Sequence, residues 1–367
     1  MATATTPAPA VVERLLTLAD ETGASDLHLE PSEDGIEVKL RRDGVLTQHE
    51  VLPTNMAPQM VGRLKALASL LAYRTDVPQE GRIPADRSGI RKEVRVATYP
   101  TLLGERVAIR LDAPQGASQA LESLGLADDV LDSLKRAIEQ PSGVLLVTGP
   151  SGSGKTTTLY SCLRHLTSNE RRRSVMTVED PIERRIPGVT QTEVNLAAGL
   201  SFERALRSLL RQDPEVLLVG EIRDRETASI ALEAGLTGHL VASTIHAGTA
   251  PQVFARLLEM QIEPFVLTTA VRGVLAQRLL RRRCPRCSGT SDCSTCHGIG
   301  YAGRCLVAEW LPMSEPLRRV ILARGDGDAF AAAAEESGFR PLREHARQLV
   351  AQGTTTEEEI HRVLGNS

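Results

Sequence analysis

The segment 149–156, which reads GPSGSGKT, constrains the fold of this chain more than any other part of the sequence. It matches the pattern G-x-x-x-x-G-K-[ST], in which a glycine-rich turn directs backbone amides at a phosphate. An apolar run at 143–148 precedes the segment, and a helical pattern follows it. A strand, a phosphate-binding loop and a helix in this order predict an α/β domain built on a parallel sheet.

The same loop predicts that the ligand is a nucleotide with magnesium. Its glycines let the backbone wrap around phosphate oxygens, and the amino end of the following helix favours negative charge. We expect Lys155 to reach the β- and γ-phosphates and Thr156 to bind the magnesium ion. The residues expected to bind the nucleotide are Gly149, Ser151, Gly152, Ser153, Gly154, Lys155, Thr156 and Thr157.

Polar residues follow three further apolar runs that alternate with helical patterns. We expect these runs to be strands of the same sheet: 174–178, 216–219 and 239–245. The first is followed by the acidic segment 179–183, the second by Glu221 and the third by His246. Because the carboxyl ends of parallel strands lie at one edge of a sheet, these residues should converge on the nucleotide. Carboxylates there can hold the waters of the metal ion or orient an attacking water, and a histidine can contact the γ-phosphate.

The N-terminal region has the alternating pattern of a separate α+β domain. Residues 35–40 alternate apolar and polar side chains and are followed by an Asp-Gly turn, which predicts a hairpin. The runs 93–98 and 106–111 alternate in the same way. The stretch 112–119 is turn-rich and weakly hydrophobic, so we expect the interdomain linker there.

Four of the six cysteines form the pattern C-x2-C-x5-C-x2-C, namely Cys284, Cys287, Cys293 and Cys296. Two C-x-x-C pairs supply four thiolates, which suit a tetrahedral zinc ion. Cysteines of a cytosolic chain are reduced, so metal binding is favoured over disulfides. The alternative is a set of reduced thiols without metal.

Composition excludes several classes of protein. No apolar stretch approaches the ~20 residues needed to cross a bilayer, and the N-terminus lacks a signal-peptide pattern, so we expect a cytoplasmic protein. A net charge of -3 argues against a protein that coats nucleic acid. One basic run has no interleaved aromatic residues, and we expect it to be solvated or to lie at a subunit interface: Arg278, Arg281, Arg282, Arg283 and Arg286.

Taken together, these motifs resemble the ATPases of bacterial type II secretion and type IV pilus systems. The matching segments are two opening signatures (25–31 and 78–83), an aspartate box (179–183), an atypical Walker B (219–224), a histidine box (237–246) and a C-terminal segment (353–360). The resemblance implies a RecA-like P-loop ATPase core. A PAS-like α+β domain would precede the core, and a small tetracysteine module and a helical tail would follow it.

Under this resemblance, specific residues acquire catalytic roles. Glu183 is implied as the carboxylate that polarises water, Glu221 as the Walker B acid at the magnesium shell, and His246 as the histidine facing the γ-phosphate. Arg95 and Arg110 match the arginines that the family's N-terminal domain offers to a nucleotide. Both alternate with apolar neighbours in their predicted strands, so we expect them to face away from the core. The role of His239, in the histidine box, stays open.

The resemblance also implies a domain order. It is a disordered tail (1–10), an N-terminal α+β domain (11–112), a linker (113–123), a RecA-like P-loop domain (124–280), a tetracysteine zinc module (281–311) and a C-terminal helical segment (312–367). The chain resembles a short form that lacks the extra N-terminal docking domain of many relatives.

The implied function is that of a hexameric motor that hydrolyses Mg-ATP. It would power the assembly or export of pilin-like subunits in a type II secretion or type IV pilus system, competence pili included. The implied partners are further copies of the chain, an inner-membrane platform protein and, indirectly, pilin-like subunits, without direct nucleic-acid contact. Such a protein is peripheral at the inner face of the cytoplasmic membrane.

Two other functions use a similar core. A ring ATPase that translocates nucleic acid would be stimulated by DNA, and it would need basic or aromatic pore loops. A nucleotide-gated switch with little turnover would lack a catalytic acid, whereas both Glu183 and Glu221 are present.

Overall fold

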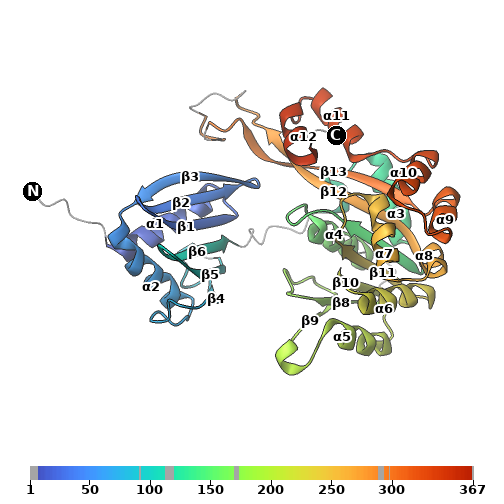
Figure 1. Ribbon diagram of the computed structural model, residues 1–367, viewed down its shortest axis with the longest axis horizontal. Coiled ribbons are helices and arrows are strands. Elements are labelled where there is room, and N and C mark those ends of the chain that lie inside the picture. Colours follow the sequence, from blue (N-terminus) through green and yellow to red (C-terminus); the bar gives the residue numbers. More distant parts are fainter. Residues whose placement is uncertain are drawn as a thin grey trace, which may run out of the picture. The chain divides into compact units, whose positions relative to one another are not determined.

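A computed structural model describes residues 7–90, 92–111, 120–168, 173–287, 293–296 and 298–365. The chain divides into two compact units, 1–117 and 118–367, and each is described by itself (Figure 1). Most of the expected linker and the start of the expected tail, residues 113–119 and 1–6, lie outside the described residues. Residues 8–10 of that tail are helical, because the first helix begins at Ala8, directly after Pro7.

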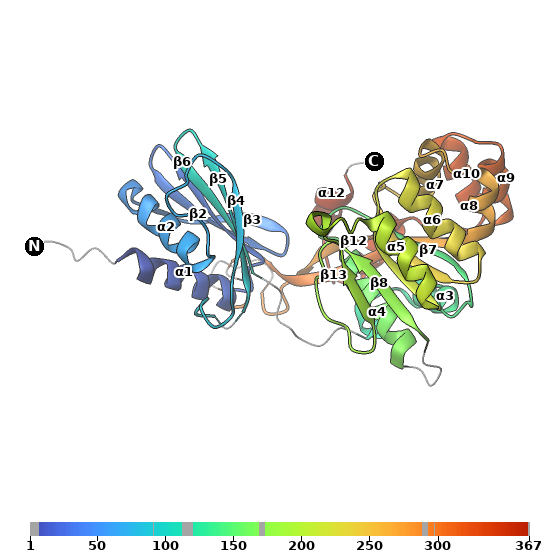
Figure 2. The same ribbon diagram turned by 90° about the horizontal axis from the view of Figure 1, so that it is seen from below.

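The first unit is an antiparallel sheet with two helices on one face (Figure 2). Its strands lie in the order β3-β2-β1-β6-β5-β4. The elements are α1 (Ala8–Glu21), β1 (Asp26–Ser32), β2 (Gly35–Arg42), β3 (Val45–Leu52), α2 (Ala57–Leu67), β4 (Gln79–Ile83), β5 (Val94–Thr101) and β6 (Gly104–Leu111). The expected hairpin is confirmed as β2 and β3. Apolar residues at every second position of the strands pack against α1 and α2, which leaves the other face polar.

The second unit is a seven-stranded sheet in the order β13-β12-β7-β11-β10-β8-β9, with helices on both faces. Its strands are β7 (Gly143–Thr148), β8 (Val175–Glu179), β9 (Thr190–Glu193), β10 (Val216–Ile222), β11 (Leu240–Ile245), β12 (Val271–Arg283) and β13 (Tyr301–Pro312). All neighbouring pairs are parallel except β12 with β13. The predicted α/β class and the four predicted strands are therefore confirmed.

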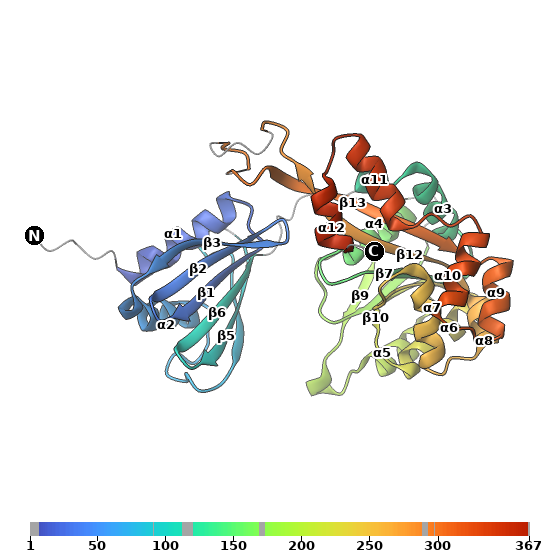
Figure 3. The ribbon, with the colours of Figure 1, turned by 45° about the horizontal axis from the view of Figure 1, so that its top comes forward.

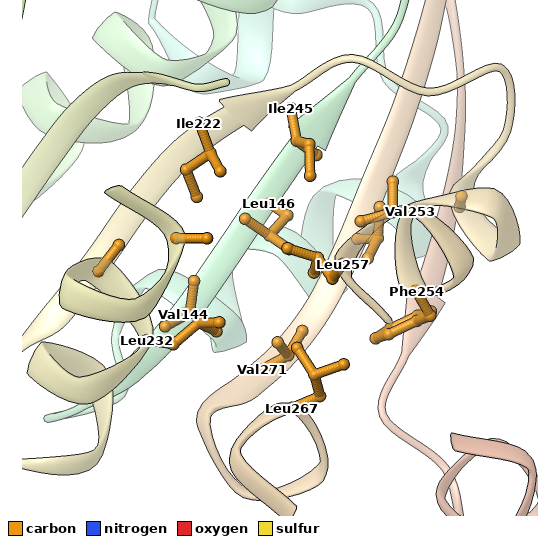
Figure 4. Packing of buried hydrophobic residues seen from close by; sticks show 14 of the residues in the cluster. Val144, Leu146, Ile222, Leu232, Ile245, Val253, Phe254, Leu257, Leu267 and Val271 are labelled. Carbon is orange, nitrogen blue, oxygen red and sulfur yellow. The ribbon is translucent and has the colours of Figure 1, made fainter. Parts of the chain in front are cut away.

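The helices of the second unit form two layers. They are α3 (Asp128–Ile138), α4 (Lys155–Ser168), α5 (Phe202–Leu209), α6 (Arg225–Leu236), α7 (Ala250–Glu259), α8 (Pro264–Ala270), α9 (Glu315–Leu322), α10 (Gly327–Glu336), α11 (Leu342–Ala351) and α12 (Glu357–Leu364). Alternate residues of β7 enter two separate cores. Leu145 and Val147 pack with α3 and α4, whereas Val144 and Leu146 pack with α6, α7 and α8 (Figure 4). Among the described residues no helix is both long and apolar enough to span a bilayer.

The strands β12 and β13 form a long antiparallel ribbon at one edge of this sheet (Figure 3). Ala276 and Gln277 of β12 lie beside the end of β7. The ribbon continues beyond that edge of the sheet to Arg283 and Tyr301. The four cysteines of the C-x-x-C pairs come directly after this projecting end. The range expected for the tetracysteine module, 281–311, therefore overlaps the end of β12 and most of β13.

Candidate functional site

The phosphate loop lies between β7 and α4, as the motif predicts. Gly149, Gly152 and Gly154 have φ values of 146°, 76° and 89°, a region that favours glycine. A Cβ atom on Gly149 would lie 2.5 Å from the backbone oxygen of Gln277 on β12. The first glycine is thus required both for the turn and for the close approach of a neighbouring strand.

Lys155 begins α4, and its ammonium group folds back over the loop. Its Nζ donates hydrogen bonds to the carbonyl oxygens of Gly149 and Pro150, at 2.7 and 3.0 Å. Burial lowers the pKa of Lys155, and the charge of Arg278 lowers it further, whereas the carboxylate of Glu221 opposes this shift. Glu221 at the end of β10 and Arg278 in the middle of β12 therefore place opposite charges near the ammonium group of Lys155.

The other loop residues have different exposures. The side chains of Ser151, Thr156 and Thr157 are exposed, so their hydroxyls are accessible to a ligand. Ser153 is buried, and its Oγ has no hydrogen-bond partner among the described residues. Its backbone oxygen accepts a hydrogen bond from Nε2 of Gln277, at 2.7 Å. The loop is consequently attached to β12 through its backbone.

The aspartate box begins with a buried carboxylate, Glu179, at the end of β8. It accepts hydrogen bonds from Oγ1 of Thr177 at 2.6 Å, from Nε2 of Gln191 at 3.1 Å and from the hydroxyl of Tyr160 on α4. Burial and this contact with Glu179 raise the pKa of Tyr160, while hydrogen bonds from the backbone amides of Glu183 and its neighbour oppose the rise. Tyr160 thus joins the helix that follows the phosphate loop to the segment that carries Glu183.

Glu221 and His246 lie at the carboxyl ends of the neighbouring strands β10 and β11. The carboxylate of Glu221 is partly buried and accepts a hydrogen bond from Nε of Arg223, at 2.7 Å. The hydroxyl of Thr244 donates to the carbonyl oxygen of Gly220, at 2.7 Å, and so fixes β11 against the residue before Glu221. His246 is exposed directly after β11.

Two residues of these motifs have structural roles instead. His239 precedes the amino end of β11, at the opposite edge of the sheet from the phosphate loop. Its Nδ1 donates to the carbonyl oxygen of Ala234 at 3.0 Å, at the end of α6. Asp224 caps the start of α6, where its Oδ1 accepts from the amide of Thr227 at 2.8 Å. His239 thus lies at the edge opposite the phosphate loop, whereas Asp224 follows β10 and its carboxylate caps α6.

Two members of the basic run contact other parts of the second unit. Arg278 is half-buried at the phosphate loop, and Arg281 forms an ion pair with the buried Glu359 of α12, at 2.8 Å. Arg281 also lies over the ring of Tyr301, 4.1 Å from its centroid. The sequence motifs give no role to Gln277, and they place Arg278 only in the basic run. The signal is the apolar stretch 273–276, which leads directly into Gln277 and Arg278.

Arg95 and Arg110 are direct partners on β5 and β6 of the first unit. Their apolar neighbours are buried, so both arginines lie on the sheet face away from α1 and α2, as alternation predicts. Arg110 is exposed, and its Nε lies 3.2 Å from Oδ1 of Asp26 on β1. The two guanidinium groups are thus adjacent on the polar face of this sheet.

The four cysteines form one cluster in which all sulfur atoms lie within 4.8 Å of one another. The Sγ atoms of Cys284 and Cys293 are 3.7 Å apart, and those of Cys287 and Cys296 are 3.3 Å apart. A tetrahedral zinc site with bonds of about 2.3 Å needs sulfur separations near ~3.8 Å, so the set fits zinc. Backbone amides at 295 and 296 lower the pKa of Cys293 to about 6, which favours the thiolate.

Comparisons with known proteins agree with this geometry. A family model described as type II/IV secretion system protein matches residues 2–362. The type II secretion system protein HxcR of Pseudomonas aeruginosa is 42% identical over 364 residues, which are 97% of this chain and 77% of that protein. The type IV pilus assembly ATPase PilB of Thermus thermophilus is 38% identical over 375 residues, which are 95% of this chain and 42% of that protein.

Structural similarity extends to a solved motor protein. The crystal structure of the pilus retraction motor PilT with bound ADP has a TM-score of 0.65 and 25% identity, and 96% of each chain is covered. The chain therefore belongs to the type II/IV secretion system protein family, which comprises secretion and pilus-assembly ATPases.

Proposed function

We propose that this secretion or pilus-assembly ATPase is a hexameric motor that hydrolyses Mg-ATP at the carboxyl edge of its seven-stranded sheet. The observation that carries the proposal is the convergence of chemically suited side chains on that edge from separate strands. Lys155 follows β7, the box with Glu183 follows β8, Glu221 ends β10 and His246 follows β11. The effect of the Glu221 charge on the pKa of Lys155 supports their action on one ligand.

Each residue has a role that its chemistry supports. The backbone N–H groups of 149 and 151–157 and the ammonium group of Lys155 bind the phosphates. The hydroxyl of Thr156 and the carboxylate of Glu221 are oxygen donors of the kind magnesium prefers, the second directly or through water. Bound magnesium neutralises charge that develops on the transferred phosphoryl group. Glu183 orients the attacking water, and His246 faces the γ-phosphate.

The first unit supplies arginines to a nucleotide held by a neighbouring subunit. Arg95 and Arg110 support this because they are adjacent and share the polar face of their sheet. Arginine presents planar, permanently charged donors that match phosphate oxygens. A site completed between subunits requires the homo-hexamer that we propose. It also couples hydrolysis to relative movement of the two units.

The motor acts on an inner-membrane platform protein from the cytoplasmic face and thereby moves pilin-like subunits. A structural zinc ion in the cysteine cluster stabilises the end of the β12–β13 ribbon. The four thiols and their separations support this assignment. Direct contact with nucleic acid is not part of the proposal.

A mixing experiment tests the shared active site. Lys155→Ala and Arg110→Ala should each abolish ATP hydrolysis, the first through the loss of a phosphate ligand and the second through the loss of the neighbour's arginine. Mixed subunits should regain activity, because some interfaces then combine an intact loop with an intact arginine. Arg14→Ala is the matched control, since Arg14 is an exposed arginine of the same unit whose Nη2 forms an ion pair with Oε1 of Glu50, at 2.7 Å.

Three results would overturn the proposal. A wild-type protein without magnesium-dependent hydrolysis would refute the enzyme function. Activity of Arg110→Ala at the wild-type rate would remove the arginine role. A mixture that stays inactive at concentrations where wild-type specific activity is maximal would show that the site is not shared.

A further inference from the structure

The loop after His246 is attached to the rest of the second unit by three polar side chains. Oγ1 of Thr148, the last residue of β7, donates to the carbonyl oxygen of Ala247 and accepts from its amide, both at 2.9 Å. Nη2 of Arg278 donates to the carbonyl oxygen of Gly248, at 2.6 Å. Three backbone polar groups of residues 247 and 248, next to His246, thus depend on two side chains from β7 and β12.

The third side chain is Glu309 of β13. Its Oε1 accepts from the amide of Ala250 at 2.8 Å, at the start of α7, and its Oε2 accepts from the amide of Leu342 at 2.8 Å, at the start of α11. Glu309 is 3% exposed. Burial raises its pKa, while the two amides and the charge of Arg278 oppose the rise. One buried carboxylate therefore caps two helices beside a guanidinium group of opposite charge.

Two of these three side chains, those of Thr148 and Arg278, also lie beside the phosphate loop. Thr148 directly precedes Gly149, so its side chain moves with the first residue of the loop. Nη1 of Arg278 lies 3.3 Å from the position that a Cβ on Gly149 would occupy. The residue before Arg278 donates to the backbone of Ser153. The side chains that hold the His246 loop therefore lie directly next to the residues that form and hold the phosphate loop.

We propose that Thr148 and Arg278 are positioning residues for hydrolysis, which set His246 at a fixed distance from the phosphate loop. This inference rests on the proposed role of His246. Neither residue needs to contact the nucleotide, because each acts through the backbone at 247–248. Loss of either contact frees the loop while leaving the phosphate ligands in place. The expected effect is a lower kcat with nearly unchanged nucleotide affinity.

A double-mutant cycle with His246→Ala tests the inference. Thr148→Val removes both hydrogen bonds at nearly constant shape, and we expect it to lower kcat about 10-fold or more. The dissociation constant for a fluorescent ADP analogue should change less than about 3-fold, because Lys155 and the loop amides remain. Thr148→Ser keeps the hydroxyl and should restore most of the rate. In the His246→Ala background, Thr148→Val should cause no further loss, since its effect passes through His246.

Arg278→Met provides a second, independent cycle should Thr148→Val prove unstable in a melting experiment. Additive losses in both cycles would overturn the inference, as would a wild-type kcat in Thr148→Val. A wild-type kcat in His246→Ala would also overturn it, without affecting the proposal that the protein hydrolyses ATP. Failure of that broader proposal is recognised separately, because it requires an inactive wild-type protein.

Discussion

Replacement of Tyr160 by phenylalanine tests whether α4 holds the catalytic segment in place. The hydroxyl of Tyr160 donates to Glu179, a carboxylate that is 4% exposed, and it is also hydrogen-bonded to the backbone amide of Glu183. Tyr160→Phe removes one oxygen atom and leaves the ring in the core. Glu179 then loses one of three side-chain donors.

The structure sets the size of the effect. A hydrogen bond to a charged group contributes about 1.5–3 kcal/mol to the free energy of unfolding. For a unit of this size each kcal/mol corresponds to about 2–4 °C, so the melting temperature of the second unit should fall by about 3–12 °C. Turnover should fall roughly 10- to 100-fold, because a small displacement of Glu183 misplaces the attacking water. Nucleotide affinity should stay near the wild-type value, since Lys155 and the phosphate loop are unchanged.

Differential scanning calorimetry and steady-state hydrolysis measure the two effects. Tyr99→Phe is the matched control, because it removes the same atom from a side chain that belongs to the first unit and is 61% exposed. It should leave the melting temperature and the rate unchanged. A Tyr160→Phe protein that melts within about 1 °C of wild type and hydrolyses ATP at the wild-type rate would refute the reasoning.

Three further predictions concern Glu183, the C-terminal helix with Glu359, and the four cysteines. Glu183→Gln should bind ATP in a filter assay but not hydrolyse it; wild-type turnover would move the catalytic role elsewhere. Burial opposes ionisation of Glu359, but hydrogen bonds from Arg362 and Arg281 hold its pKa below the usual 4.5. This stabilisation is complete above pH 4.5 and is lost as the pH falls through the lowered pKa, so Glu359→Gln should weaken the acid dependence of urea unfolding. Purified protein should contain one zinc per chain by elemental analysis, and Cys287→Ser should release it.

The phosphate loop and its strand could be predicted from the sequence because the signal is local. A motif of eight residues, 149–156, fixes the turn, and the apolar run before it has the length of one buried strand. The acids and histidine at the other strand ends could be predicted for a similar reason, since Glu221 lies at the end of a buried strand and Glu183 and His246 follow buried strands. Because these strands are parallel, their carboxyl ends place the acids and the histidine at one edge of the sheet.

The contacts around these residues could not be predicted, because they join segments far apart in the chain. Glu309 reaches α7, 59 residues before it, and α11, 33 residues after it. Gln277 contacts the loop across 124 residues. The second half of β12 carries four arginines. Because charge normally indicates exposure, the sequence predicts that they are solvated or at a subunit interface. Its pairing with β13 and the ion pair of Arg281 allow charged residues to lie within a sheet.

The continuity of β12 links two chemically different ends of the second unit. From Arg278, beside the phosphate loop, to Cys284, at the sulfur cluster, the backbone advances six residues, or about 20 Å in extended form. Over this span β12 is paired with β13, with one irregularity in register between Arg281 and Arg283. The same strand approaches the first glycine of the phosphate loop and leads into the first cysteine of the cluster. The phosphate loop and the sulfur cluster therefore share a single strand as their common support.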